Sequence, residues 1–188
     1  QHAGDPNNPG LGYSSNTAGH RFLTAVSYRT QSGTSFSVYW ETRTIGNFSY
    51  VYGGDMNFDG GTSNDLIYIP KNTSEMNFEQ YAASGRTFTV AEQVAAWEAF
   101  IEADKYLSKN RGKYAERGAA FLPTVSRADF SISHDFKVHV GGSRNVLQVR
   151  MDVQNFTNML NKDWGVSTRV VSNAPLIPRG VDANGVPI

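Results

Sequence analysis

The stretch from residue 127 to residue 155 constrains the fold more than any other, because its side chains alternate between apolar and polar types. The apolar positions are Ala128, Phe130, Ile132, Phe136, Val138, Val140, Leu147, Val149, Met151 and Val153. The positions between them are mostly polar or charged, and Gly141, Gly142 and Ser143 separate the two runs. Successive side chains of a strand point to opposite faces, so the pattern predicts a long antiparallel hairpin with one apolar and one polar face.

The same alternation occurs near the start of the chain and predicts a second hairpin with its turn at residues 31 to 33. Its apolar positions include Phe22, Val26, Tyr28, Phe36, Val38 and Trp40. One more strand is predicted to begin at residues 166 to 171. The predicted fold class is therefore all-β with one helical insertion, built on about four to five antiparallel strands.

Residues 44 to 126 leave this pattern and form a long insertion. Within the insertion, Thr89 and Glu92 have the spacing of a capping box, and Val94, Trp97 and Ile101 follow at helical spacing. These signals predict a helix near residues 90 to 109. The first 20 residues and those after 156 are rich in Gly, Pro, Asn and Ser, which is typical of loops.

The lengths of the connections are unequal in a way that suggests a transmembrane barrel. The turns at 31 to 34 and 141 to 143 are short, and the other segments are long. In an up-and-down meander both short turns then lie at one end of the sheet, as in outer-membrane barrels with short periplasmic turns and long extracellular loops. Because the smallest bacterial barrel needs about eight strands, the chain is predicted to be a fragment of an antiparallel up-and-down transmembrane β-barrel.

Two other classes of protein are compatible with alternating strands. The first is a soluble, secreted, calcium-binding β-sandwich module that binds carbohydrate, since sandwich strands also alternate. The second is a surface adhesion or structural protein. His134 lies on the otherwise apolar face of its strand and argues against lipid contact there. The one-sided distribution of long connections favours the barrel, because a sandwich does not require it.

Composition excludes several functions. The 17 basic residues balance the 17 acidic ones, so the charge does not suggest a nucleic-acid partner. The chain has no cysteine for a thiolate ligand or nucleophile, and its four histidines lie in no catalytic or metal-binding motif. We therefore expect that the chain is not an enzyme and that it has no catalytic residues.

A loop of the insertion contains a candidate calcium site. Asp55, Asn57 and Asp59 precede Gly60 in the order D-x-N-x-D-G, the first half of a calcium-binding loop, and Asp65 offers another carboxylate. Leu66 occupies the position at which an EF-hand has its bidentate glutamate. The alternative is a loop in which these side chains cap neighbouring backbone groups as Asx-turns. Calcium is the one cofactor that the sequence suggests.

Several aromatic residues of the long segments have two interpretations. They are Phe48, Tyr50, Tyr52, Tyr68, Trp97 and Trp164. They could face a sugar or peptide ligand, or they could form a small core that holds the insertion together. The sequence favours the core, because Trp97 shares a helical face with Val94 and Ile101.

Four segments together resemble a known family. They are GGDMNFDGGTSNDLIYIP (53 to 70), DKYLSKNRGKYAERGA (104 to 119), RADFSISHDF (127 to 136) and VRMDVQNFTNMLNKDWG (149 to 165). In this order they resemble the C-terminal part of the β-barrel in TonB-dependent outer-membrane receptors of the Bacteroidota, the Oar-like kind with a carboxypeptidase-regulatory-like domain. The segment NFTNMLN matches an asparagine-aromatic motif of these receptors. The resemblance covers residues 20 to 185.

The resemblance implies that residues 1 to 188 are the C-terminal segment of such a barrel, with 44 to 126 as an extracellular loop insertion. The parent receptor would take up a nutrient or macromolecular ligand across the bacterial outer membrane through a barrel of about 22 strands. Implied partners are outer-membrane lipid, the rest of the barrel and its plug, the TonB complex through an N-terminal part that is not in this chain, and a surface lipoprotein. The transported substrate is not implied.

Overall fold

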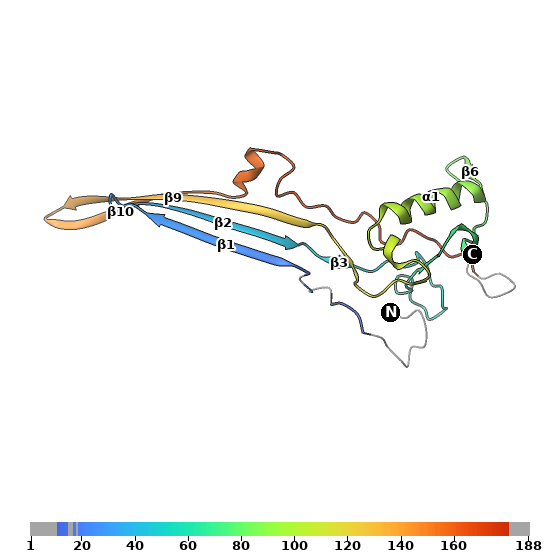
Figure 1. Cartoon of the computed structure of the whole chain (residues 1–188). Coiled ribbons are helices and arrows are strands. Elements are labelled where there is room, and N and C mark those ends of the chain that lie inside the picture. The colour runs from blue at the N-terminus through green and yellow to red at the C-terminus, as the bar shows by residue number, and fades with distance from the viewer. Residues whose placement is uncertain (1–10, 15–16, 18, 181–188) are drawn as a thin grey trace. The chain divides into compact units, whose positions relative to one another are not determined.

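The computed structural model describes residues 11 to 14, 17 and 19 to 180 (Figure 1). The loop predicted for residues 1 to 19 and the end of the chain from 181 therefore lie wholly or partly outside the described residues. The described part is mainly β, with 40% strand and 14% helix. It forms two compact units. Unit 1 comprises Gln1–Thr17, Asn47–Phe121 and Val170–Ile188, and unit 2 comprises Ala18–Gly46 and Leu122–Arg169.

Unit 2 is a four-stranded antiparallel sheet in the order β1-β2-β9-β10 (Figure 1). Its strands are β1 (Arg21–Arg29), β2 (Thr34–Thr44), β9 (Thr124–Val140) and β10 (Ser143–Val153). If the residues of unit 1 are left out, the order of the strands in the sheet is their order along the chain. The sheet is therefore a meander. Both predicted hairpins are confirmed, and the predicted antiparallel strands form a single sheet.

Glycines set the register at both short turns. Gly141 and Gly142 have φ of 58° and 80°, and they join Val140 to its ladder partner Ser143. A two-residue turn with two positive φ values has the twist that suits a hairpin, and only glycine adopts it without strain. The β1–β2 turn has three residues and ends on Gly33 with φ of 94°. Sequence and turn geometry therefore agree on which residues pair.

The two short turns lie at the same end of the sheet, because β2 and β9 pair antiparallel. The segment before β1, the segment between β2 and β9 and the segment after β10 all leave from the opposite end. This confirms the predicted asymmetry of the connections. In the described residues β1 and β10 are the edges of an open sheet, and no closed barrel forms.

Unit 1 is built from short strand pairs around a helix. β3 (Asn47–Phe48) pairs with β8 (Ala120–Phe121), β4 (Tyr68–Ile69) with β7 (Lys113–Tyr114), and β5 (Tyr81–Ala83) with β6 (Arg86–Phe88). One-turn 3₁₀ helices occur at η1 (Thr73–Glu75) and η2 (Ser108–Asn110), and a third, η3 (Phe156–Met159), belongs to unit 2. The core of unit 1 contains Tyr50, Tyr52, Ile67, Ile69, Trp97, Ile101, Leu107, Ala115 and Ala120.

All three long segments of the sequence contribute to unit 1. The Tyr13 amide donates to the Arg117 carbonyl at 2.9 Å, which ties the N-terminal segment to the insertion. The Gly53 amide donates to the Leu176 carbonyl at 2.7 Å, which ties the C-terminal segment to it. The long connections are therefore not independent loops but parts of one folded unit.

Helix α1 (Val90–Ala103) begins as predicted but ends earlier than the predicted residue 109. Thr89 and Glu92 form the capping box, each side chain accepting from the other's backbone amide. At the other end Asp104 adopts an extended conformation. Its carboxylate accepts from the amides of Tyr106 and Leu107, both at 2.8 Å, so it starts a turn in place of another helical residue.

The strand predicted to begin at residues 166 to 171 is absent, and this prediction was wrong. No other described segment pairs with these residues, and a strand exists only where its N–H and C=O groups have a partner ladder. The preceding NFTNMLN segment forms η3, which starts at Asn155 in the left-handed region with φ of 51°. The main sheet therefore has four strands, at the lower end of the predicted number.

The capping box provides a test of unit 1. Replacing Thr89 with alanine removes the acceptor for the Glu92 amide and should cost about 1 kcal/mol of local stability, which corresponds to roughly fivefold faster hydrogen exchange in the first turn of α1. Exchange measured by mass spectrometry on peptides covering α1 checks this expectation. Thr87→Ala, in the exposed strand β6, is the matched control and should leave that exchange unchanged.

Candidate functional site

The register of unit 2 places most apolar side chains of the four strands on one face, and Leu23 and Val146 lie on the other, opposite Glu41 and Lys137. Cross-strand partners on this face include Val26 with Val38, Phe36 with Ile132, Val38 with Phe130, and Leu147 with Phe136. In an antiparallel pair, residues directly opposite point to the same side of the sheet. The two predicted hairpins thus join into one continuous apolar face, which we call the apolar face of unit 2.

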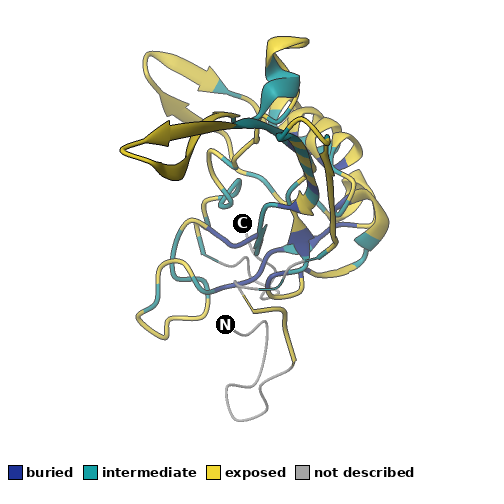
Figure 2. Cartoon of the chain, turned by 90° about the vertical axis from the view of Figure 1, so that its left-hand side faces the viewer, coloured by how far each residue is buried: buried dark blue, intermediate teal, exposed yellow. Residues whose placement is uncertain are grey.

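This face is open to the surroundings, as Figure 2 shows by the exposed colouring of much of the sheet. Exposure is 61% for Val26, 51% for Trp40, 57% for Leu147 and 54% for Met151. Soluble monomers rarely leave contiguous apolar patches larger than a few hundred Å² uncovered. The exposed apolar side chains of this face extend across all four strands.

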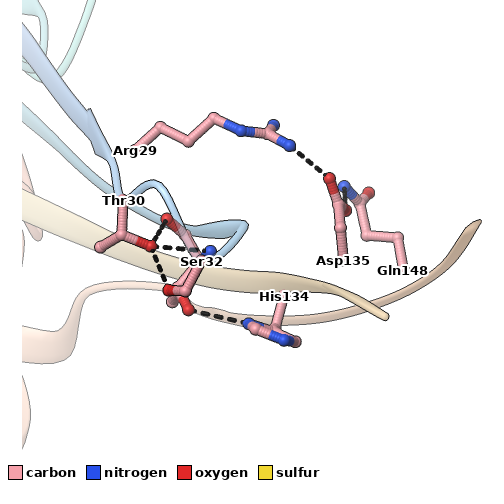
Figure 3. Close-up of polar contacts among 7 residues, drawn as sticks. Arg29, Thr30, Ser32, His134, Asp135 and Gln148 are labelled. Carbon is pink, nitrogen blue, oxygen red and sulfur yellow. Dashed lines mark hydrogen bonds and ion pairs between the residues drawn. The ribbon is translucent and has the colours of Figure 1, made fainter. Parts of the chain in front are cut away.

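The opposite face of the sheet is polar and carries a network of charges. Arg21 donates to Glu41 at 2.8 Å across the β1–β2 pair. Further along, Arg29 on β1 and Gln148 on β10 both donate to Asp135 on β9 (Figure 3). Such a face is suited to water or to another polar surface. One face of unit 2 is therefore mainly apolar and the other is mainly polar.

His134 is a polar residue on the apolar face, but its side chain has a hydrogen-bond partner there. Its Nδ1 atom lies 2.8 Å from the Thr34 hydroxyl, so the ring is hydrogen-bonded to the neighbouring strand (Figure 3). Thr34 is the first residue of β2, directly after the short turn. His134 therefore lies level with the short-turn end of the β1–β2 hairpin, and β9 continues beyond it paired only with β10.

Among the described residues, no helix has both the length and the apolar character needed to cross a membrane.

The proposed calcium ligands lie in one loop, where their oxygens cap the backbone. Asp55 accepts from the amides of Asp59 at 3.1 Å and Gly60 at 2.8 Å, and Asp59 accepts from the Gly61 amide at 2.7 Å. Asn57 accepts from the Asp59 amide at 2.9 Å. The Gly61 amide is the main cause that lowers the pKa of Asp59 below its ordinary value. This is the Asx-turn alternative in detail.

Asp65 differs from the other three candidate ligands in being buried. It is 3% exposed, and its Oδ2 atom accepts from the Met56 amide at 2.6 Å and the Asn57 amide at 3.3 Å. Its Oδ1 atom is buried without a hydrogen-bond partner. Across the described residues, no three His, Asp or Glu side chains are grouped as a metal site would need. The geometry fits a self-capped loop better than an ion cage, and calcium stays a prediction of the sequence.

Most of the singled-out aromatic residues belong to the core of unit 1. Tyr50, Tyr52 and Trp97 are 4%, 8% and 6% exposed, as the core interpretation expects. The Tyr50 hydroxyl donates to Asp104 at 2.7 Å, and burial together with this bond raises the pKa of Tyr50 well above its ordinary value. Phe48 packs against this core, whereas Trp164 is 51% exposed in unit 2.

An aromatic hollow of about 970 Å³ lies in unit 1 beside this core. Its lining includes Tyr52, Tyr68 and Trp97 from the singled-out set and, in addition, Phe78, Tyr81, Phe100 and Tyr114. These last four residues are not among those that the sequence singles out. Residues 71 to 86 have no clear period, so nothing in the sequence shows that their side chains meet those of α1 and β7.

Comparison with known proteins adds no relative, because no protein family, no curated protein and no solved structure matches the chain.

The contribution of Asp65 to the stability of its loop can be tested without adding a metal ion. Asp65→Ala leaves the partly buried amides of Met56 and Asn57 without this acceptor and should cost about 1–3 kcal/mol of stability in unit 1. Thermal unfolding followed by near-ultraviolet circular dichroism measures this loss. Asp163→Ala, at an exposed turn of unit 2, is the matched aspartate control and should unfold like the native chain.

The calcium hypothesis makes a separate prediction. If Asp55, Asn57, Asp59 and Asp65 hold calcium, hydrogen exchange across the loop should slow when calcium replaces a chelator, and Asp55→Asn together with Asp59→Asn should remove the effect. Equal exchange with and without calcium would contradict the hypothesis and leave the self-capped loop.

Proposed function

We propose that this chain is part of the β-barrel of a TonB-dependent outer-membrane receptor and takes part in the energised uptake of a nutrient or macromolecular ligand. The single observation that carries the proposal is the exposed apolar face of unit 2, which spans four antiparallel strands opposite a charged face. Lipid is the apolar partner that such a face meets in an outer-membrane barrel, where the lumen side is polar.

The open edges of the sheet support the same proposal. Among the described residues, β1 and β10 each pair on one side only, which leaves a row of unpaired N–H and C=O groups along each strand. Long open edges of this kind invite further strands. In the proposed receptor, the neighbouring strands of the same barrel complete both edges, and this chain contributes four of a larger number.

The arrangement of the connections gives independent support. Long segments leave unit 2 only at the end opposite the two short turns. Those same segments contribute to unit 1, which has its own buried core. In the proposed orientation, the short turns are periplasmic and unit 1 is an extracellular module formed from the long loops.

The charged face would then line the interior of the barrel. Arg29, Asp135 and Gln148 link three strands on this side, which suits a wet lumen or contact with a plug. Implied partners are outer-membrane lipid, the remaining strands and the plug, the TonB complex and a surface lipoprotein.

The alternative of a soluble β-sandwich requires a second sheet over the apolar face. The other sheets in the described residues are two-stranded pairs of two or three residues per strand, and the apolar face of unit 2 remains exposed. The structure therefore provides no observation that favours the carbohydrate-binding sandwich over the barrel.

Photolabelling in native membranes tests the proposal. A phospholipid with a photoactivatable diazirine in its acyl chain should form adducts with Phe36, Val38 and Trp40, because these residues share the proposed lipid face. Ser35, Ser37 and Tyr39 on the same strand should stay unlabelled and act as internal controls. Mass spectrometry of proteolytic peptides locates the adducts.

The outcome separates the two classes of protein. Adducts at alternate positions of β2, in a polypeptide that needs detergent for extraction from the outer membrane, support the barrel. A polypeptide that is soluble without detergent and forms no adducts would overturn the proposal and favour the sandwich.

A pair of charge substitutions tests the same face energetically. Val38→Arg places a cation on the proposed lipid face and should destabilise the membrane-inserted barrel by about 2–4 kcal/mol if the site lies near the bilayer centre. Ser37→Arg, one residue away on the polar face of the sheet, is the matched control. The amount of folded receptor in the outer membrane, read from heat-modifiable gel mobility, should fall for the first variant only. Equal loss in both variants would contradict the assignment of faces.

A further inference from the structure

The aromatic hollow of unit 1 has features that the proposed barrel does not explain. It lies within unit 1, between η1, the segment after it, helix α1 and residues 175 to 179. Its volume of about 970 Å³ is at the upper end of the range of ligand sites. Seven aromatic residues contribute to its walls, and aromatic side chains are common in sites that recognise organic ligands.

The exposed aromatic rings of the hollow are held in place by other rings. Phe100, 41% exposed, stacks on Trp97 with ring centroids 5.4 Å apart. Tyr114, 48% exposed, meets Tyr68 edge-on at 5.4 Å. Rings fixed in this way lose little conformational entropy when a ligand covers them, which makes them suitable contact surfaces.

Residues 76 to 80 form a rim of the hollow that starts in an extended conformation at Met76, and most of its main-chain groups have no protein partner. Met76 has φ of −86° and ψ of 114°, and Met76 and Phe78 pack inward while Asn77 and Glu79 are exposed. Within the described residues, the amides of 77 to 80 donate to no protein acceptor, and of these residues' carbonyls only that of Glu79 is bonded, by Gln93 at 2.8 Å. β5 continues this segment and pairs with β6, but nothing pairs with the rim itself.

Unpaired N–H and C=O groups in an extended segment are the feature that binds a peptide by strand addition. In that mode the main chains provide hydrogen bonds, and alternate side chains of the peptide enter pockets. A saccharide would use the aromatic rings but would not require the row of main-chain groups. The combination of rim and hollow therefore favours a peptide.

The charges beside the rim favour a basic residue in that peptide. Glu75 and Glu79 both line the hollow next to the extended segment. The Lys71 amide, which donates to Glu75 at 2.8 Å, is the main cause that lowers the pKa of Glu75 below its ordinary value. The one cationic lining residue, Arg179, lies on the separate segment after residue 175.

We infer that the hollow of unit 1 binds an extended peptide, which adds as a strand to residues 76 to 80, places apolar side chains on the aromatic rings and sets a basic side chain near Glu75 and Glu79. The inference rests on the proposed function in that it names the class of ligand that the receptor captures. The binding is a property of unit 1 and can be measured separately from membrane insertion.

The test uses the native polypeptide in detergent and a fluorescein-labelled hexapeptide of alternating threonine and phenylalanine with lysine at its first position. Fluorescence anisotropy measures binding. Two further hexapeptides carry N-methyl groups at either the odd or the even positions. Strand addition uses the amides of alternate residues only, so one of these two should bind at least about tenfold more weakly and the other about as well as the parent.

Variants of the protein complete the test. Glu79→Lys, on an exposed side chain, should weaken binding of the lysine peptide at least about threefold, and added salt should reduce the difference. Phe100→Ala should weaken binding at least about tenfold through loss of ring contact. Phe58→Ala, an 81% exposed aromatic residue of unit 1 outside the hollow, is the matched control and should bind normally.

Three outcomes would overturn the inference. They are no binding of the hexapeptide, equal effects of the two N-methylation patterns, and preferential binding of a neutral oligosaccharide such as cellohexaose that the Phe100→Ala variant abolishes. If peptide binding fails while the photolabelling pattern on β2 is observed, the ligand class is wrong and the barrel proposal stands.

Discussion

The hydrogen-bonded ladder that joins β1, β2, β9 and β10 is the constraint on which the rest of the structure depends. Because the side-chain period of a strand is two, a shift of one residue between two paired strands would turn all apolar side chains of one strand to the polar face. Gly33 and the pair Gly141 and Gly142 prevent such a shift by fixing which residues leave and enter each turn. The ladder also decides the ends of the sheet, and therefore where every long segment must begin.

The two units differ in how far they bury their apolar side chains. Unit 1 buries Ile67, Ile69, Ile101 and Leu107 completely, so its core is internal and complete. Unit 2 has almost no buried side chains along β1 and β10, and its apolar face is left for something outside the described chain. The proposed outer-membrane barrel would supply lipid for this face and neighbouring strands for both edges.

Unit 1 shows how polar, glycine-rich segments become ordered without a long sheet. Asp65, Asp104 and Glu92 each accept hydrogen bonds from amides that would otherwise be unpaired. The buried rings of Tyr50, Tyr52 and Trp97 then fill the space between the short strand pairs and α1. The segment at 77 to 80 is the exception, because its amides have no such acceptor. These unbonded amides are available to bind the main chain of a ligand.

Local patterns in the sequence determined the four long strands, both hairpin turns, the start of α1 and the polar and apolar faces, because each depends on residues close together in the chain. They did not determine the end of α1, where the Asp104 carboxylate caps the next turn and also meets Tyr50. Nor could they show that residues 166 to 171 lack a strand partner, or that the Asp55 to Asp59 side chains would cap their own loop. The aromatic hollow was likewise decided by tertiary structure alone, since it depends on residues 68 to 114 and 175 to 179 meeting across long stretches of sequence. Periodicity records which face a side chain takes, but only the folded chain brings those faces together.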